Sequence, residues 1–360
     1  MKTLHVAIIG SHGLYANYGG WDQLVNNLAE KHNPNVHYTI YNSRESQKHE
    51  SYPIGVNVIH LPWKASGAEG MIYDLFSIIQ AFWKADVLLL LGVQGMPILF
   101  LLLFFRKIRV IGNVGGVEWE RPKFNILAKL YLKFCFNLAM RISDVVILDN
   151  KHYAKFLPRK YRAEVSFIPY GGVIDQSLEI NQTLLQKYPF LGTTYYLSVS
   201  RSISDNQVME LCDYFADRSE NLVMISNFSR SDYGKSILKK HGGRSNLILI
   251  DGLYKKDELD LIRVSCRAYI HTHTLCGTAP SLVEMIMSRR PIISVDIPQN
   301  RFTMDGTGFF YKNFSDIDRV LDEETDLDHL VNDPTIMERY EWSTIIRQYE
   351  SLYDNDRGRR

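Results

Sequence analysis

The segment Leu4–Lys31, LHVAIIGSHGLYANYGGWDQLVNNLAEK, decides the fold class. Its first residues are a short, mostly apolar run that ends at Gly10, which predicts a buried strand over Leu4–Ile9. Apolar residues at helical spacing then predict a helix over Gly20–Lys31. A strand, a glycine-rich turn and a helix in this order are typical of a parallel α/β sheet. The turn is too long for the dinucleotide motif GxGxxG, which argues against a dehydrogenase.

The same alternation of strand and helix patterns continues through both halves of the chain. Further strands are expected at residues 37–41, 56–60, 87–91, 108–113, 144–148, 165–168, 195–200, 222–226, 247–250, 268–271 and 291–295. Helices are expected at residues 71–84, 124–142, 206–218, 233–241, 256–264, 281–288 and 334–353. This pattern predicts an α/β protein of two doubly wound, Rossmann-like domains that face a cleft. We place them at residues 1–175 and 185–333, with a linker within 171–192 and a C-terminal helix within 334–360.

Composition excludes several classes of protein. The chain has 360 residues, 46% of them hydrophobic and 22% charged, so it is neither disordered nor fibrous. A formal net charge of +1 gives no general attraction to nucleic acid. Four cysteines without a CxxC pair argue against a disulfide framework and fit a reducing cytoplasm. The first ten residues lack the long apolar run of a secretory leader.

The apolar stretch Val87–Phe105 has about the length of a membrane-spanning helix. Gly92, Gln94, Gly95 and Pro97 interrupt its middle. We therefore expect a buried strand, a turn and a buried helix rather than a span.

The first turn contains candidate ligand-binding residues. Gly19 and Gly20 stand just before the predicted helix, where glycine allows a ligand to approach the backbone and helix amides favour a phosphate. The alternative is a tight turn with no ligand. His12 is expected near the tip of this turn, at the cleft.

Four sequence blocks resemble a family of bacterial glycosyltransferases, many of them rhamnosyltransferases. The first is ANYGG at Ala16–Gly20, which family members follow with Phe and this chain with Trp21. The others are NVGGVEWERPKF from Asn113, FIPYGG from Phe167 and HTHTLCGTAPSLVEM from His271. The resemblance implies the GT-B architecture, with a nucleotide-sugar donor on the C-terminal domain, an acceptor on the N-terminal domain and a last helix that returns to the N-terminal domain.

The resemblance also implies a donor site. Arg201 matches a cation that meets the pyrophosphate, and its charge could stabilise the leaving nucleoside diphosphate. Glu284 matches a carboxylate that accepts hydrogen bonds from the ribose, whereas Cys276 replaces a Glu that contacts the sugar in many retaining enzymes. The alternatives are a surface role for Arg201 and a helix N-cap role for Ser281. The predicted donor site comprises Gly19, Gly20, Arg201, Asn206, Gly277, Thr278, Ser281 and Glu284.

The acceptor site is expected after the strand that ends at Asn113. An exposed pair of Glu118 and Trp119 suits a sugar, since the carboxylate accepts hydroxyl hydrogen bonds and the indole packs on C–H groups. Gly115 replaces a family Asp, so Glu118 is the candidate catalytic carboxylate. The alternative is that Glu118 only favours a helix start. The predicted acceptor site comprises His12, Asn17, Tyr18, Glu118, Trp119 and Arg121.

His271, His273 and Cys276 are spaced closely enough to raise the question of a metal site. No second ligand cluster of matching spacing accompanies them, and GT-B enzymes typically need no metal. We therefore expect no metal and no cofactor. Buried histidines of a strand explain His271 and His273 more simply.

The function expected from the resemblance is a retaining transfer of a hexosyl group, most often L-rhamnosyl from dTDP-rhamnose, to a lipid-linked saccharide for O-antigen or capsule synthesis. The alternatives are another donor such as UDP-galactofuranose or UDP-glucose, a GT-B epimerase, and a non-catalytic subunit that binds a nucleotide sugar. The basic, aromatic-rich helix near residues 123–141 could place this cytoplasmic protein peripherally on the inner face of the membrane. No nucleic-acid partner is expected.

Overall fold

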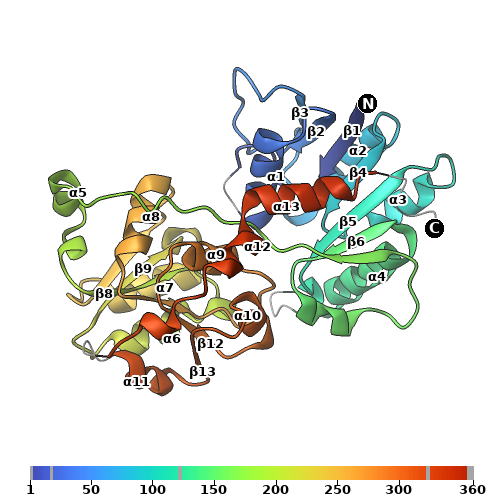
Figure 1. Cartoon of the computed structure of the whole chain (residues 1–360). Helices are drawn as coiled ribbons and strands as arrows, with labels where there is room; N and C mark the ends of the chain where they lie inside the picture. The colour runs from blue at the N-terminus through green and yellow to red at the C-terminus, as the bar shows by residue number, and fades with distance from the viewer. Residues whose placement is uncertain (1–2, 17–18, 121–123, 322–324, 355–360) are drawn as a thin grey trace. The chain divides into compact units, whose positions relative to one another are not determined.

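The computed structural model describes residues 3–16, 19–120, 124–321 and 325–354, and divides the chain into two compact units. Unit 1 comprises the residues up to Tyr170 together with those from Trp342 on, and unit 2 comprises Gly171–Glu341. Each unit is a parallel sheet with helices, as the alternating pattern predicts (Figure 1).

The sheet of unit 1 has seven strands in the order β3-β2-β1-β4-β5-β6-β7. Its strands are β1 (Leu4–Ile9), β2 (Val36–Asn42), β3 (Val56–His60), β4 (Val87–Leu91), β5 (Arg109–Gly115), β6 (Val145–Leu148) and β7 (Glu164–Phe167). Its helices are α1 (Gly20–Lys31), α2 (Gly67–Phe82), α3 (Met96–Leu102), α4 (Ile126–Ile142) and α13 (Trp342–Ser351). The five residues of β4 are all buried because helices cover both faces of a parallel sheet.

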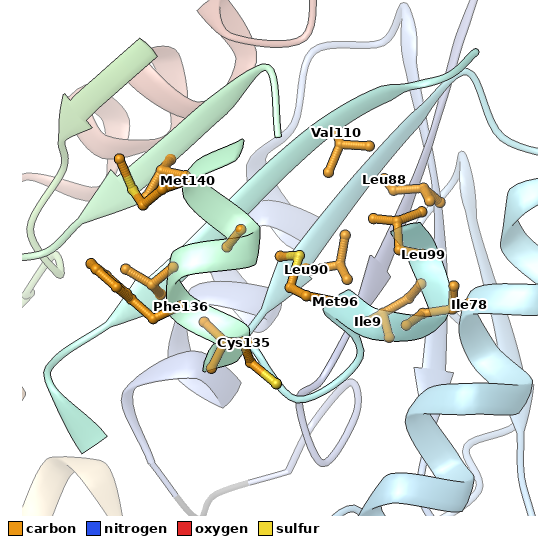
Figure 2. Close-up of a cluster of buried hydrophobic side chains, with 14 of the residues drawn as sticks. Ile9, Ile78, Leu88, Leu90, Met96, Leu99, Val110, Cys135, Phe136 and Met140 are labelled. Atoms are coloured by element: carbon orange, nitrogen blue, oxygen red, sulfur yellow. The ribbon is translucent and has the colours of Figure 1, made fainter. Parts of the chain in front are cut away.

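One side of this sheet carries a core built with α2, α3 and α4. Figure 2 shows Leu88 and Leu90 of β4 facing Met96 and Leu99 of α3, with Phe136 of α4 nearby. The expected split of Val87–Phe105 into a strand, a turn and a helix is confirmed by β4 and α3. The expected burial of the whole helix is wrong, because Phe100 and Leu101 of α3 are exposed. Within the described residues, no helix has both the length and the apolar character needed to cross a membrane.

The sheet of unit 2 has six strands in the order β10-β9-β8-β11-β12-β13. Its strands are β8 (Tyr195–Val199), β9 (Asn221–Ser226), β10 (Leu247–Asp251), β11 (Ala268–His271), β12 (Ile292–Val295) and β13 (Phe309–Tyr311). Its helices are α5 (Gln182–Lys187), α6 (Val208–Phe215), α7 (Asp232–His241), α8 (Lys256–Ser265), α9 (Pro280–Met287), α10 (Pro298–Thr303), α11 (Asp318–Leu321) and α12 (Thr335–Tyr340).

Two expectations about the ends of unit 2 are wrong. The segment 171–192 is part of unit 2 rather than a linker, since Phe190 and Leu191 are buried in its core. The helix expected over 334–353 is interrupted, because Glu341 is extended and pairs with Gly172. It becomes α12 in unit 2 and α13 in unit 1.

The strand order of each sheet locates the place where a ligand would bind. In doubly wound sheets, ligands bind at the carboxyl ends of strands where the strand order reverses. This switch point lies between β1 and β4 in unit 1 and between β8 and β11 in unit 2. His12 and Gly19 lie between β1 and α1, and the loops after β8 and β11 hold Arg201 and the residues from Thr272 to Ala279.

Candidate functional site

Hydrogen bonds join the loops after β8 and β11 of unit 2. The Thr274 N–H donates to the Asp205 carbonyl at 3.0 Å, and the Thr272 hydroxyl donates to the Asn206 carbonyl. Two segments that are distant in the sequence therefore form one surface at the switch point.

Arg201 lies on this surface. Its side chain is exposed, while its carbonyl accepts a hydrogen bond of 2.9 Å from the side-chain amide of Asn206. Asn206 itself is buried. The structure therefore brings together these two predicted donor residues, with Asn206 holding the backbone that carries the guanidinium.

The β11 loop leads into α9 through Gly277 and Thr278, of which Thr278 is buried. The helix begins at Pro280, and its N-cap residue Ala279 offers no side-chain cap. Ser281 is therefore inside the first turn, so its alternative N-cap role is wrong.

Glu284 of α9 is part of a charged network. Its carboxylate accepts a hydrogen bond from the guanidinium of Arg263 on α8, which is only 4% exposed. Arg263 also contacts Asp260 at 3.3 Å, and Asp260 pairs with Lys256. Glu284 thus balances a buried charge, a structural role that the sequence analysis did not identify.

His271, His273 and Cys276 form a compact group behind this surface. The ligand-type atoms of the three side chains all lie within 4.8 Å of one another. Burial, and secondarily His273, lowers the pKa of His271 well below its ordinary value, so its imidazole is neutral. The Cys276 thiol donates to Asn300 Oδ1 at 3.4 Å. Three such ligands could hold a metal, one fewer than a structural zinc site has. Independence of metal therefore stays a prediction.

Two buried polar atoms in the same region lack a hydrogen-bond partner in the part of the chain that the structure describes. Within the described residues, Ser200 Oγ and His271 Nε2 make no hydrogen bond. Such groups are rare in folded proteins and call for an explanation. Ser200 is not among the predicted site residues; its only sequence signal is its position next to Arg201 at the end of a predicted strand.

In unit 1, the loop after β1 is packed tightly at the switch point. Gly10 has φ +97°, and a Cβ there would lie 2.1 Å from the Leu91 carbonyl oxygen of β4. Asp22 of α1 is buried and holds His12, accepting from its backbone N–H at 3.0 Å and lying 3.3 Å from its Nδ1. A buried carboxylate at Nδ1 orients a histidine for proton transfer or hydrogen bonding through its other nitrogen.

Gly19 is the N-cap of α1 and Gly20 is its first residue, so the two glycines stand at the helix start. A Cβ on Gly19 would meet nothing within 4 Å, so local packing does not require glycine there. The carboxylate of Asp22 lies in the first turn of α1 and disfavours a phosphate at that end. The three predicted residues Asn17, Tyr18 and Arg121 lie outside the residues that the structure describes.

We expected Glu118 and Trp119 to be an exposed pair, and this expectation is wrong for Trp119. Trp119 is 7% exposed and packs in the core of unit 1, with its ring 4.8 Å from that of Phe136. An apolar indole in a short helical turn is more stable in the core than in water, and its face is not available to a sugar. Glu118 is half-buried and stays a candidate.

Comparisons with known proteins bear on the fold of the chain. A family model described as a domain of unknown function (DUF1972) matches residues 3–173. No curated protein sequence matches the chain.

Solved structures match both units. A sucrose-phosphate synthase from Thermosynechococcus elongatus has a TM-score of 0.77 at 14% identity, over 97% of this chain and 98% of that one. The Anabaena protein HepE, in complex with UDP-glucose, has a TM-score of 0.73 at 14% identity, over 97% and 99%. A trehalose-phosphate synthase from Burkholderia xenovorans, in complex with glucose-6-phosphate, has a TM-score of 0.73 at 10% identity, over 98% and 100%. The fold is GT-B. At these identities the likeness to known GT-B proteins shows the fold alone.

Proposed function

We propose that this chain is a glycosyltransferase that takes its sugar from a nucleoside diphosphate. The observation that carries the proposal is the joined surface at the switch point of unit 2, where Arg201 is exposed on a loop held by Asn206 and by the β11 loop. An exposed guanidinium suits a diphosphate, because it offers a fixed positive charge and several N–H donors. Structures with the same fold were solved with UDP or UDP-glucose.

The reaction we propose retains the configuration of the sugar. Of the carboxylates that the resemblance leads us to expect at the donor, Glu284 is engaged by Arg263 and Cys276 stands in place of the other Glu, so the proposal uses no covalent nucleophile. The glycosidic bond to the diphosphate breaks as the acceptor hydroxyl adds from the same face, and a diphosphate oxygen takes the hydroxyl proton. Arg201 stabilises the negative charge that grows on the diphosphate, an effect of about 3 kcal/mol for one well-placed donor.

Acceptor contacts are assigned to unit 1. His12, oriented by Asp22, and Glu118 supply hydrogen bonds to acceptor hydroxyls in this proposal. We further propose specific substrates. The donor is dTDP-L-rhamnose, and the acceptor is a lipid-linked saccharide that becomes part of a surface polysaccharide. The sequence resemblance in the ANYGG block supports this choice of substrates.

A transfer screen tests the proposal. Purified protein is incubated with a lipid-linked saccharide and one donor, which is dTDP-rhamnose, UDP-glucose or UDP-galactofuranose. Mass spectrometry then measures the masses of the products. We expect one hexosyl addition with one donor. Arg201→Ala should lower turnover at least about a hundredfold, whereas Arg319→Ala, exposed on α11 of the same unit, should not. Isomerised donor without acceptor would identify an epimerase, and binding without any transfer would identify a non-catalytic subunit.

A further inference from the structure

An extensive apolar surface covers one side of unit 1. Most of the large hydrophobic side chains that are exposed among the described residues belong to α2, to α3 and the residues that follow it, or to α4. Figure 1 labels these three helices within unit 1. We call this set the apolar face. It comprises Met71, Ile72, Phe76, Ile79, Trp83, Phe100, Leu101, Phe104, Phe105, Ile126, Leu127, Leu130 and Phe134. Phe104 and Phe105 are each 75% exposed.

The three segments that carry the apolar face pack against one another. Helix α3 contacts both α2 and α4. A Cβ on Gly95, the N-cap of α3, would lie 2.2 Å from Ile78 Cδ1 of α2, which shows how closely these helices approach. The Tyr131 hydroxyl of α4 donates to the Gln94 carbonyl before α3 at 2.9 Å.

The same helices are also apolar on the side that faces the sheet. Figure 2 shows Ile78, Met96, Leu99 and Phe136 in the core beneath them. Helix α3 (MPILFLL) is hydrophobic all round, and such a helix belongs in a protein core or in contact with lipid. Soluble monomers rarely expose an apolar patch of this extent.

Basic residues accompany the apolar face. They are Lys84, Lys107, Lys129, Lys133 and Arg141, whereas the guanidinium of Arg106 donates to the Phe82 and Ala85 carbonyls. Among residues 71–84, 96–107 and 126–142, the one carboxylic acid is Asp74, which is buried. Burial raises the pKa of Asp74 to about 7, so this carboxyl is only about half ionised near neutral pH. Two such faces pressed together would bring like charges close, which disfavours a second copy of this chain as the occupant.

We infer that the apolar face docks on an anionic lipid bilayer, with Trp83, Phe104 and Phe105 entering the interface and the basic residues meeting the headgroups. The inference extends the proposed function, because an enzyme on a bilayer meets lipid-linked acceptors there. Docking itself rests on the surface of unit 1 and can be measured without any transfer activity.

Vesicle sedimentation tests the inference on the full chain. One set of vesicles is pure phosphatidylcholine and the other also contains phosphatidylglycerol. We expect binding to the anionic vesicles, weakened at least about tenfold by the double change Phe104→Ser and Phe105→Ser and also weakened by Lys129→Glu with Lys133→Glu. The matched control is Ile54→Ser, which removes a 96% exposed hydrophobic residue of unit 1 outside the apolar face.

Three outcomes would overturn the inference: no binding to either vesicle, equal binding of wild type and the Phe variant, or a wild-type dimer that the Phe variant converts to a monomer without vesicle binding. Circular dichroism checks that each variant is folded. Nucleotide titration separates this result from the proposed function, since the Phe variant should bind nucleoside diphosphate like wild type. Arg201→Ala should conversely keep its vesicle binding.

Discussion

The carboxylate of Glu284 on α9 accepts a hydrogen bond from the buried guanidinium of Arg263 on α8. Removing one partner of a buried ion pair leaves an uncompensated charge. Because Asp260 still lies 3.3 Å from Arg263, we expect Glu284→Ala to lower the free energy of unfolding by about 3 kcal/mol and Glu284→Gln by about 1 kcal/mol. Urea denaturation followed by circular dichroism measures both.

The control for this pair is Glu179→Ala, an exposed carboxylate of unit 2 outside helices and strands. If Glu284 also binds ribose, the folded Gln variant should bind nucleotide more weakly than wild type in calorimetry. Equal stability of the Ala variant and the control would contradict the structural role of Glu284.

Trp21 and Gly115 should be coupled. A Cβ on Gly115, which has φ +58°, would lie 3.1 Å from Trp21 Cζ2. We expect Gly115→Asp to destabilise by about 2 kcal/mol, and Trp21→Phe in the same chain to restore about 1 kcal/mol by removing the crowding ring. Chemical denaturation of the single and double variants gives the coupling energy.

The matched control for the backbone strain is Gly306→Asp, because Gly306 has φ +78° and a Cβ there would meet nothing within 4 Å. Gly306→Asp should lower the free energy of unfolding through backbone strain alone, because the new side chain crowds no neighbour. Trp21→Phe should therefore not restore the stability of this variant. Additive effects of Gly115→Asp and Trp21→Phe would refute the coupling.

Helix α13 is tied to the sheet of unit 1 by a buried hydrogen bond. The side-chain amide of Asn113 on β5 donates to the Tyr349 hydroxyl at 2.6 Å. Tyr349→Phe leaves this buried donor without its partner, so we expect a loss of about 1–3 kcal/mol of unfolding free energy. Tyr161→Phe, at an exposed tyrosine of unit 1, should change the value by less than about 0.5 kcal/mol. A loss no larger than that of the control would contradict the assigned bond.

Asp74 should make stability depend on pH. Burial raises its pKa to about 7 in the folded chain, against about 3.9 in an unfolded chain. The folded state therefore holds the proton more tightly, so this contribution is fully present below about pH 4, falls as the pH rises and levels off above about pH 7. The total change is on the order of 4 kcal/mol. The difference in unfolding free energy between wild type and Asp74→Asn should follow this curve, and a constant difference from about pH 5 to pH 8 would contradict it.

Much of the fold is predictable from local pattern. The apolar runs of β1 and β4 and the glycines between β4 and α3 set a strand-helix alternation that needs no distant information. Short elements at the edge of a sheet are not predictable from local pattern alone. Strand β13 has three residues, and the break at Glu341 depends on pairing with Gly172, which is far away in the sequence.

The candidate site is predictable only in part. The positions of Arg201 and the β11 loop follow from strand ends, since the carboxyl ends of parallel strands share one edge of the sheet. Burial of Trp119 and the pairing of Glu284 with Arg263 depend on tertiary packing that spacing along the chain does not encode. The link between His12 and Asp22 could have been found from the sequence, because an acid in the first turn of α1 lies beside the loop that precedes the helix.

The most direct measurement of the central claim is a crystal structure of the chain with a nucleoside diphosphate bound, UDP or dTDP. The account predicts that the diphosphate lies within hydrogen-bond distance of the Arg201 guanidinium, against the loops that follow β8 and β11. A nucleotide bound elsewhere, with Arg201 in contact only with solvent, would contradict it.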